Sequence, residues 1–255
     1  RGERSLIYLP EVTLAKGSNV ISVLITKIND QVGDDENCNN ILTTVLDAIV
    51  PAAHKRVLVE EGTGTWCGWC PRGAVAMDKY NDIYNNLFVP VALHGGSSAE
   101  PMRLVEYDLF LNFTSFPGAK VDRGDFIDPG DSEAPFLTNI TKAPLAKLES
   151  GARLNEADNI LDISVDVEFL DKAAGNFYVS MILTEDDVKG TSSGYAQANY
   201  YSGGGAGQMG GYEILPNPVP ASKMVYNHVA RAVSGLNRST ANSITGNSFT
   251  AGNKS

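Results

Sequence analysis

The chain has 255 residues, of which 43% are hydrophobic, enough to bury a sizeable core and to form two or three modules. Its formal net charge is −10, from 30 acidic and 20 basic residues. This balance argues against nucleic acid or an anionic membrane surface as a partner, because a phosphate-binding face needs clustered Lys and Arg. Since no stretch approaches the roughly 18 apolar residues of a membrane-spanning helix, the sequence predicts no transmembrane segment.

The first 50 residues have the pattern of β-strands. Two β-branched runs, at 19–28 and 41–46, flank an acidic turn. Two or three strands do not make a stable sandwich alone, so we interpret residues 1–50 as the closing strands of an immunoglobulin-like β domain, or as strands added to the edge of the next domain. The chain has no initial Met and begins without a signal peptide, so we expect a fragment whose upstream part is missing.

The acidic turn between these runs contains the first of three cysteines, Cys38. Its acidic neighbours should raise the pKa of the thiol, which makes Cys38 a poor nucleophile. The carboxylates from Asp30 to Glu36 lack the regular spacing of a calcium loop. We therefore expect a solvated hairpin turn here, with no bound metal or cofactor.

From residue 51 to residue 142 the pattern alternates between strands and helices. We expect a strand at 57–59, a helix after Cys70, a strand at 89–94, a helix from Pro101, a strand after Pro117 and a short helix at 132–142. This order gives a βαβ unit followed by a hairpin and a helix. It resembles the thioredoxin arrangement and predicts an α/β domain over residues 51–142.

After residue 143 the hydrophobic period returns to two. Apolar residues alternate with polar ones from Leu161 to Phe169, and a second strand pattern follows at 177–183. We interpret residues 143–255 as a β-sandwich domain, incomplete at its C-terminal end. Residues 190–211 are rich in Gly and Ser and predict a long mobile loop.

The run Cys67-Gly68-Trp69-Cys70 carries the clearest chemical signal. Two intervening residues at a strand-to-helix junction bring the two sulfurs within bonding distance, and the helix amino end favours a thiolate on the first cysteine. Cys67 is then the nucleophile and Cys70 the resolving thiol of a redox pair. The spacing alone also allows a zinc site or a structural disulfide.

The surrounding residues favour redox chemistry. Zinc needs four ligands, whereas the chain has no second C-x-x-C and its three histidines, His54, His94 and His228, are widely spaced. We expect His94 and His228 to have structural roles. Trp66 would shield one side of the cysteines, and Pro117 precedes a strand at a position where a cis-proline could pack against a disulfide.

These residues resemble the thioredoxin superfamily over about residues 55–142. The resemblance implies a cis bond before Pro117 and a Phe116 backbone that pairs with a substrate strand beside Cys67. It also implies a buried carboxylate that relays protons to Cys70, for which Glu60 and Glu61 are candidates. Neighbouring strand residues face opposite ways, so at most one serves; Glu61 is preferred, and a solvated strand end is the alternative. Trp69 and the bulky Phe116 depart from the family pattern.

A closer match is to the twenty-eight-kilodalton outer-membrane-protein family, exported lipoproteins with a thioredoxin-like middle. The match is carried by the segments 57–73, 115–117, 183–186 and 227–232. It implies export to the periplasm or the outer-membrane surface, with a lipid anchor in a segment missing from this chain. Protein thiols or disulfides, and an envelope protein, are then the expected partners. The activity expected is that of a thiol-disulfide oxidoreductase; the alternative is a surface binding or adhesion protein whose disulfide is structural.

Overall fold

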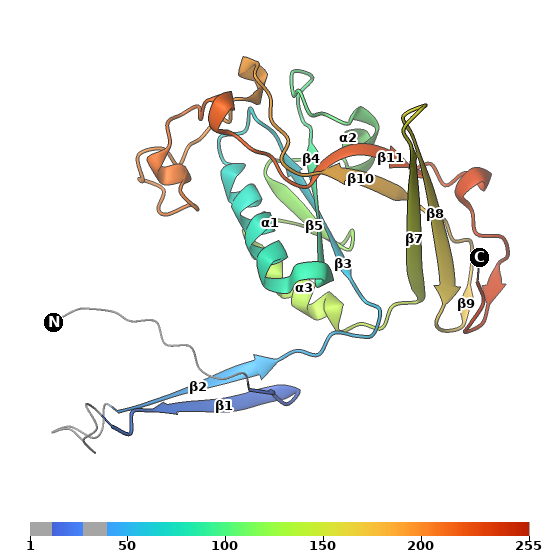
Figure 1. Cartoon of the computed structure of the whole chain (residues 1–255), viewed down its shortest axis with the longest axis horizontal. Coiled ribbons are helices and arrows are strands. Elements are labelled where there is room, and N and C mark those ends of the chain that lie inside the picture. The colour runs from blue at the N-terminus through green and yellow to red at the C-terminus, as the bar shows by residue number, and fades with distance from the viewer. Residues whose placement is uncertain (1–11, 28–39, 255) are drawn as a thin grey trace. The chain divides into compact units, whose positions relative to one another are not determined.

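The computed structural model describes residues 12–27 and 40–254, and the chain divides into two compact units, Arg1–Pro51 and Ala52–Ser255. The first unit contains strands β1 (Gly17–Leu24) and β2 (Ile41–Ala48), paired antiparallel (Figure 1). The two strand patterns expected here are therefore confirmed in the described part. Cys38 and the acidic turn lie outside the described residues, and the immunoglobulin-like character of this unit stays a prediction.

The second unit is built around a mixed sheet of six strands, in the order β10-β11-β4-β3-β5-β6. Strand β3 pairs in parallel with β4 and antiparallel with β5, and β5 pairs antiparallel with β6. The elements that form the middle of this sheet and its helices follow one another in the chain as β3 (Val57–Thr63), α1 (Pro71–Tyr84), β4 (Phe88–His94), α2 (Val105–Leu111), β5 (Gly118–Val121), β6 (Phe126–Ile127) and α3 (Glu133–Ile140).

Helices cover both faces of this sheet. On one face, α1 and α3 pack on Val57 and Val59 of β3, and on the other face α2 packs on Val91 and Leu93 of β4. Because side chains alternate along a strand, Glu61 lies on the same face as Val57 and Val59. The alternation of β3 therefore fixes which helix each of its polar side chains meets.

Helix α2 begins later than the sequence pattern indicates. We expected a helix from Pro101, whereas the structure has turns at Pro101 and Met102 and begins the helix at Val105. The reason is local: the backbone N–H of Met102 lies 3.3 Å from Oε1 of Glu100 and donates to it, so the chain is drawn towards that carboxylate before the helix starts.

The segment after residue 142 does not form the separate β-sandwich that we expected. Strand β11 pairs in parallel with β4 through Val229 and Ala92, so β10 and β11 extend the central sheet. Alternation predicts strands but not their partners, and the buried Val229 and Ala230 cover a β4 edge that would otherwise be exposed. The strands of this segment are β7 (Ala146–Asn155), β8 (Ile160–Phe169), β9 (Ala173–Ala174), β10 (Met181–Glu185), β11 (Val229–Ser234) and β12 (Ser248–Phe249).

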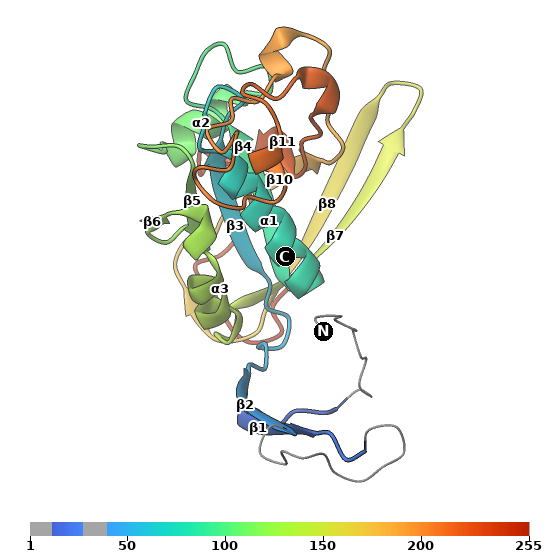
Figure 2. The same cartoon turned by 90° about the vertical axis from the view of Figure 1, so that its left-hand side faces the viewer.

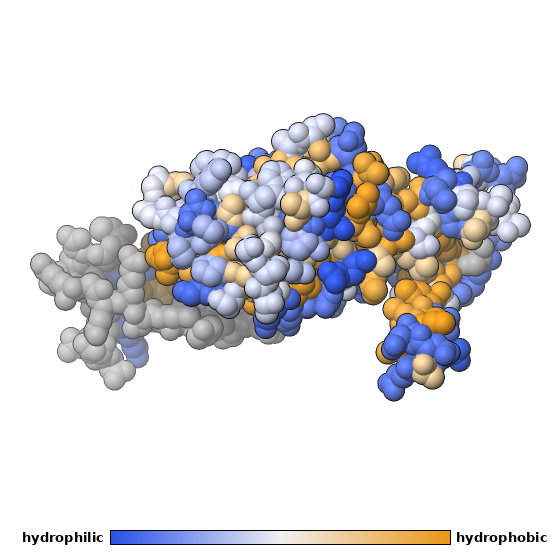
Figure 3. Space-filling model, turned by 90° about the horizontal axis from the view of Figure 1, so that it is seen from above, coloured by the Kyte–Doolittle hydropathy of each residue, from blue (hydrophilic) through white to orange (hydrophobic). Residues whose placement is uncertain are grey.

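Strands β7 and β8 form a long antiparallel hairpin that leaves the body of the second unit (Figure 2). In Figure 3 hydrophobic side chains are visible along this projection, and those exposed on it include Leu148, Leu154, Ile160, Leu161 and Ile163. At its base, Phe169 stacks on Phe249 of β12. Among the described helices, none has the length and apolar character needed to cross a membrane.

Candidate functional site

Cys67 and Cys70 form a disulfide between the end of β3 and the start of α1, with their Cα atoms 5.4 Å apart. Cys70 is the N-cap residue of α1, and Pro71 occupies the first helical position, where its missing N–H costs nothing. Residue Cys67 is 5% exposed and Cys70 is 1% exposed. The cysteines expected to pair are therefore bonded to each other, and both are buried.

One wall beside the disulfide is aromatic. The peptide bond between Phe116 and Pro117 is cis, as the thioredoxin resemblance implies, and it directly precedes β5. The Phe116 ring packs against Trp66, with ring centroids 5.4 Å apart. Trp66 is anchored by its indole N–H, which donates to the carbonyl of Gly95 at 3.0 Å, yet 45% of the residue is exposed. Trp66 thus presents a fixed apolar surface next to Cys67.

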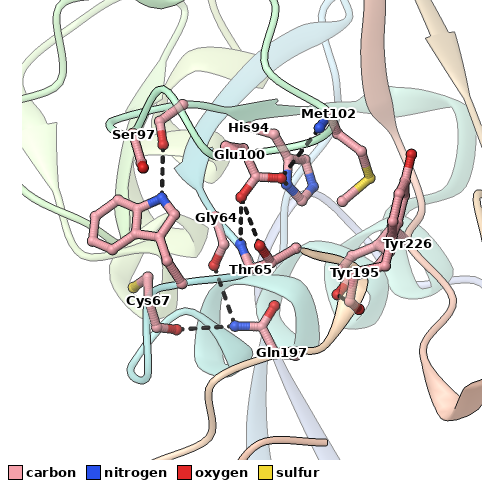
Figure 4. A network of polar contacts seen from close by, with 12 residues as sticks. Gly64, Thr65, Cys67, His94, Ser97, Glu100, Met102, Tyr195, Gln197 and Tyr226 are labelled. Carbon is pink, nitrogen blue, oxygen red and sulfur yellow. Dashed lines mark hydrogen bonds and ion pairs between the residues drawn. The ribbon is translucent and has the colours of Figure 1, made fainter. Parts of the chain in front are cut away.

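A buried polar network holds the turn that leads into the cysteines (Figure 4). Oε2 of Glu100 accepts hydrogen bonds from the backbone N–H of Thr65 at 2.7 Å and from its hydroxyl at 2.9 Å. Its other oxygen lies 3.1 Å from Nδ1 of His94. Burial by itself would raise the pKa of Glu100, but the hydrogen bonds from His94 and Thr65 hold that pKa below its usual value. Sequence reasoning missed Glu100, which no motif marks.

Residues 196–201, here called the strap, cross over the cysteine motif. The side-chain amide of Gln197 donates to the carbonyl of Cys67 at 2.9 Å and to that of Gly64 at 3.2 Å. Backbone N–H groups of Ala198 and Tyr200 donate to the carbonyls of Thr65 and Gly68. The strap therefore satisfies main-chain acceptors on both sides of Cys67.

Aromatic contacts complete this cover. The ring of Trp69 meets the rings of Tyr200 and Tyr201 edge-on, with centroids 5.4 Å and 5.3 Å away. A Cβ atom at Gly68 would lie 2.5 Å from the Tyr200 ring, so this close approach requires glycine. The prediction of a mobile loop is thus wrong for the strap. The amide of Gln197 and the rings of Tyr200 and Tyr201 have partners in the cysteine motif, which the glycine content of the segment does not indicate.

The two candidate carboxylates lie on opposite faces of β3, and both are buried. Glu60 faces α2, where its carboxylate accepts a hydrogen bond from the hydroxyl of Tyr107 and pairs with Arg123 at 3.2 Å. Glu61 faces α1, and among the described residues no group donates a hydrogen bond to its Oε1. The solvated strand end, considered as an alternative, is therefore wrong for both residues.

Glu61 lies tightly against the first turn of α1. A Cβ atom at Gly73 would lie 1.9 Å from Oε1 of Glu61, so a glycine at this position makes room for the carboxyl group. Burial raises the pKa of Glu61 to about 8, the hydrogen bond from Thr63 opposes this, and the negative charges of Asp78 and Asp128 add to it. A group with this pKa holds a proton at neutral pH and can release it.

A cavity of about 140 Å³ lies next to Glu61 and Cys70. His228, which is far from the cysteines in the sequence, also lines it, together with Asp78 of α1 and Gln197 of the strap. The sequence gives no signal for this, because His228 comes from the segment that precedes β11. Within residues 12–27 and 40–254, no group of three or more His, Cys, Asp or Glu side chains is placed to hold a metal ion.

The site is thus a buried disulfide at a strand-to-helix junction of a mixed α/β protein. The sequence matches no protein-family model and no curated protein. Among solved structures, protein AGR_C_4864 of Agrobacterium tumefaciens is similar at 14% identity and a TM-score of 0.46, covering 78% of each chain. HBP35 of Porphyromonas gingivalis is similar at 14% identity and a TM-score of 0.43, covering 77% of this chain and 63% of that chain.

Proposed function

We propose that residues 51–142 form a thioredoxin-like domain that carries out thiol-disulfide exchange through Cys67 and Cys70. The observation that carries this proposal is the disulfide at the junction of β3 and α1. The order of elements from β3 to α3, with sheet order β4-β3-β5-β6, supports the same fold.

The two cysteines have different roles in this reaction. Cys67 has the greater exposure, so an incoming thiolate attacks its sulfur. The Cys67–Cys70 bond breaks as a bond between Cys67 and the incoming sulfur forms, and the electron pair stays on Cys70. The Cys70 thiolate takes a proton from the Glu61 carboxyl group, which lines the same cavity. In the reverse direction Cys70 gives its proton to Glu61 and displaces the partner thiolate from Cys67.

Trapping experiments test these roles. In a C38S background, which leaves only the motif cysteines, C70S should accumulate a mixed disulfide with a disulfide-bearing protein such as oxidised insulin or one from an envelope extract. The Cys67 thiolate attacks the substrate disulfide, the second substrate sulfur leaves as a thiolate, and no Cys70 is present to resolve the new bond. C67S should not, because Cys70 is the more buried of the two. Reduction of insulin by the unmodified protein gives the activity itself. Equal trapping by both variants would contradict the assigned roles, and the absence of trapping and of insulin reduction would remove the function.

A second function is favoured by one observation, the burial of both cysteines beneath the strap. In this case the disulfide is structural, and the protein is a surface binding or adhesion protein. Titration against graded redox buffers distinguishes the two. A reduction potential below about −300 mV, together with no reductase activity, is typical of a structural disulfide.

The resemblance to exported outer-membrane lipoproteins supports the proposal that the protein works in the cell envelope, in the periplasm or at the outer-membrane surface. There the β segments would position the exchange domain near a partner protein that carries thiols or disulfides. Fractionation of cells that express the natural gene tests this location. Recovery in the cytoplasmic fraction would contradict it.

A further inference from the structure

The cavity behind Cys70 is polar and is built from several parts of the chain. Its titratable wall residues are Glu61, Asp78, His94, Tyr212, Tyr226 and His228. At about 140 Å³ it has room for several water molecules, and its wall offers them hydrogen-bond partners. Because Cys70 and Glu61 both belong to this wall, the cavity is suited to carry protons.

His228 stands between this cavity and two exposed carboxylates. Its Nε2 lies 3.4 Å from Oδ1 of Asp78, and its Nδ1 lies 3.2 Å from Oδ1 of Asp186. The two aspartate side chains are 53% and 63% exposed, whereas the His228 side chain is 14% exposed. The imidazole therefore contacts solvent-facing groups while it also lines the interior space.

The backbone fixes the position of this ring. The N–H of His228 donates to Oδ1 of Asp186 at 2.7 Å, and its carbonyl accepts from the N–H of Ala92 at 2.7 Å. These two bonds hold His228 at φ +58, a conformation that side-chain-bearing residues seldom adopt. His228 is therefore held by Asp78 of α1, by Ala92 of β4 and by Asp186 in the turn after β10.

Most of the other titratable groups of the wall are poorly placed to exchange protons with solvent. His94 is buried and engaged with Glu100. Burial raises the pKa of Tyr212 to about 12, and the pKa of Tyr226 is raised for the same reason, so both hydroxyls stay neutral near pH 7. Asp78 also contacts solvent, and its carboxylate lies 3.4 Å from Nε2 of His228. Since imidazole is the side chain that most readily gains and loses a proton near neutrality, His228 is the best candidate of this pair.

We propose that His228, oriented by Asp78 and Asp186, transfers protons between solvent and the Glu61–Cys70 cavity. This inference rests on the proposed exchange reaction and adds the residue that restores Glu61. After Cys70 has taken the proton of Glu61, the Glu61 carboxylate regains one from the protonated His228 through cavity water. The neutral imidazole then takes a proton from solvent, which returns His228 and Glu61 to their starting protonation states.

The test is the rate at which dithiothreitol reduces the disulfide of the full chain, followed by the fluorescence of Trp66 and Trp69 between pH 6 and 9. H228N is compared with H54N, because both histidines have positive φ, +58 and +62, a conformation that Asn tolerates. His54 is exposed and does not line the cavity. We expect H228N to react about tenfold more slowly at pH 7, and added imidazole to restore the rate, while H54N reacts like the unmodified protein.

The outcomes separate this inference from the function on which it rests. An H228N rate equal to that of the unmodified protein, or a slower rate that imidazole does not restore, overturns the role of His228. If E61Q reacts as fast as the unmodified protein, the proton transfer by Glu61 fails instead. Should H228N not fold, D186N carries the test: loss of its charge should shift the pH profile of the rate to lower pH, and an unchanged profile overturns the proposal.

Discussion

Glu60 and Glu61 are neighbours on strand β3, and both are buried, but their surroundings differ. On the α2 face, Tyr107 and Arg123 supply Glu60 with a hydrogen bond and a positive charge. On the α1 face, Glu61 meets a cavity, the negative charges of Asp78 and Asp128, and no donor for Oε1 among the described residues. Burial alone therefore does not identify a proton carrier. What distinguishes Glu61 is burial combined with too few hydrogen-bond donors, which raises its pKa.

The largest expected effect concerns the pH dependence of stability. The folded-state pKa of Glu61 is raised to about 8 from 4.5, so the folded protein binds the extra proton between these values and its stability falls as pH rises through them. E61Q has no carboxyl group to ionise at this position, so it does not lose stability in this way. Its stability relative to the unmodified protein should increase by on the order of 4 kcal/mol between pH 5 and pH 8.5.

Urea denaturation at several pH values measures this difference. The exposed Glu106 of α2 provides the control, since E106Q should leave the pH dependence unchanged. If E61Q follows the same curve as the unmodified protein, the carboxyl group is ionised at neutral pH and the contrast between the two faces of β3 is lost.

A smaller effect of opposite sign is expected on the other face. E60Q removes the charge that pairs with Arg123 and weakens the hydrogen bond from Tyr107. It should destabilise the protein by about 2 kcal/mol at pH 7, because charge-assisted hydrogen bonds are stronger than neutral ones. The same urea experiment gives the value. If E60Q instead increased the free energy of unfolding, burial of the Glu60 carboxylate would destabilise the fold, as burial of Glu61 does, and the contrast between the two faces would be lost.

The smallest effect concerns the strap. Q197A removes two hydrogen bonds to the carbonyls of Cys67 and Gly64 and should cost about 1 to 2 kcal/mol. It should also increase the rate at which dithiothreitol reduces the disulfide, because the cover over Cys67 is loosened. Q208A is the matched control, since Gln208 lies in the same Gly-rich segment but is exposed. Equal rates for Q197A and Q208A would show that the strap does not limit access.

The strands and helices around the cysteines could be predicted because their signals are local. Alternation places Glu60 and Glu61 on opposite faces, but it does not choose between them. The residues that pair with Glu60 lie 47 and 63 positions later in the chain, and Tyr107 is separated from Arg123 by β5. Which of the two glutamates pairs with Tyr107 and Arg123 is decided by tertiary packing, and this cannot be read from a single sequence.

The strap was unpredictable for a related reason. The glycine content of residues 190–211 predicts a mobile loop, whereas Gly203 and Gly204 adopt φ values of +84 and +75 that favour glycine for steric reasons. The partners of Gln197 are main-chain carbonyls, and these leave no trace in residue identity. Likewise, His228 reaches the cavity only because β11 joins the edge of β4.

The contact between Gln197 and Gly64 joins residues 133 positions apart in the chain. Contacts over such a distance form late in folding, since the entropy of closing a long loop opposes them, whereas Cys67 and Cys70 lie in one local turn. The disulfide can therefore form before the strap covers it. In the folded protein, the contacts of the strap with Cys67 and Gly64 must loosen before a partner sulfur reaches that bond.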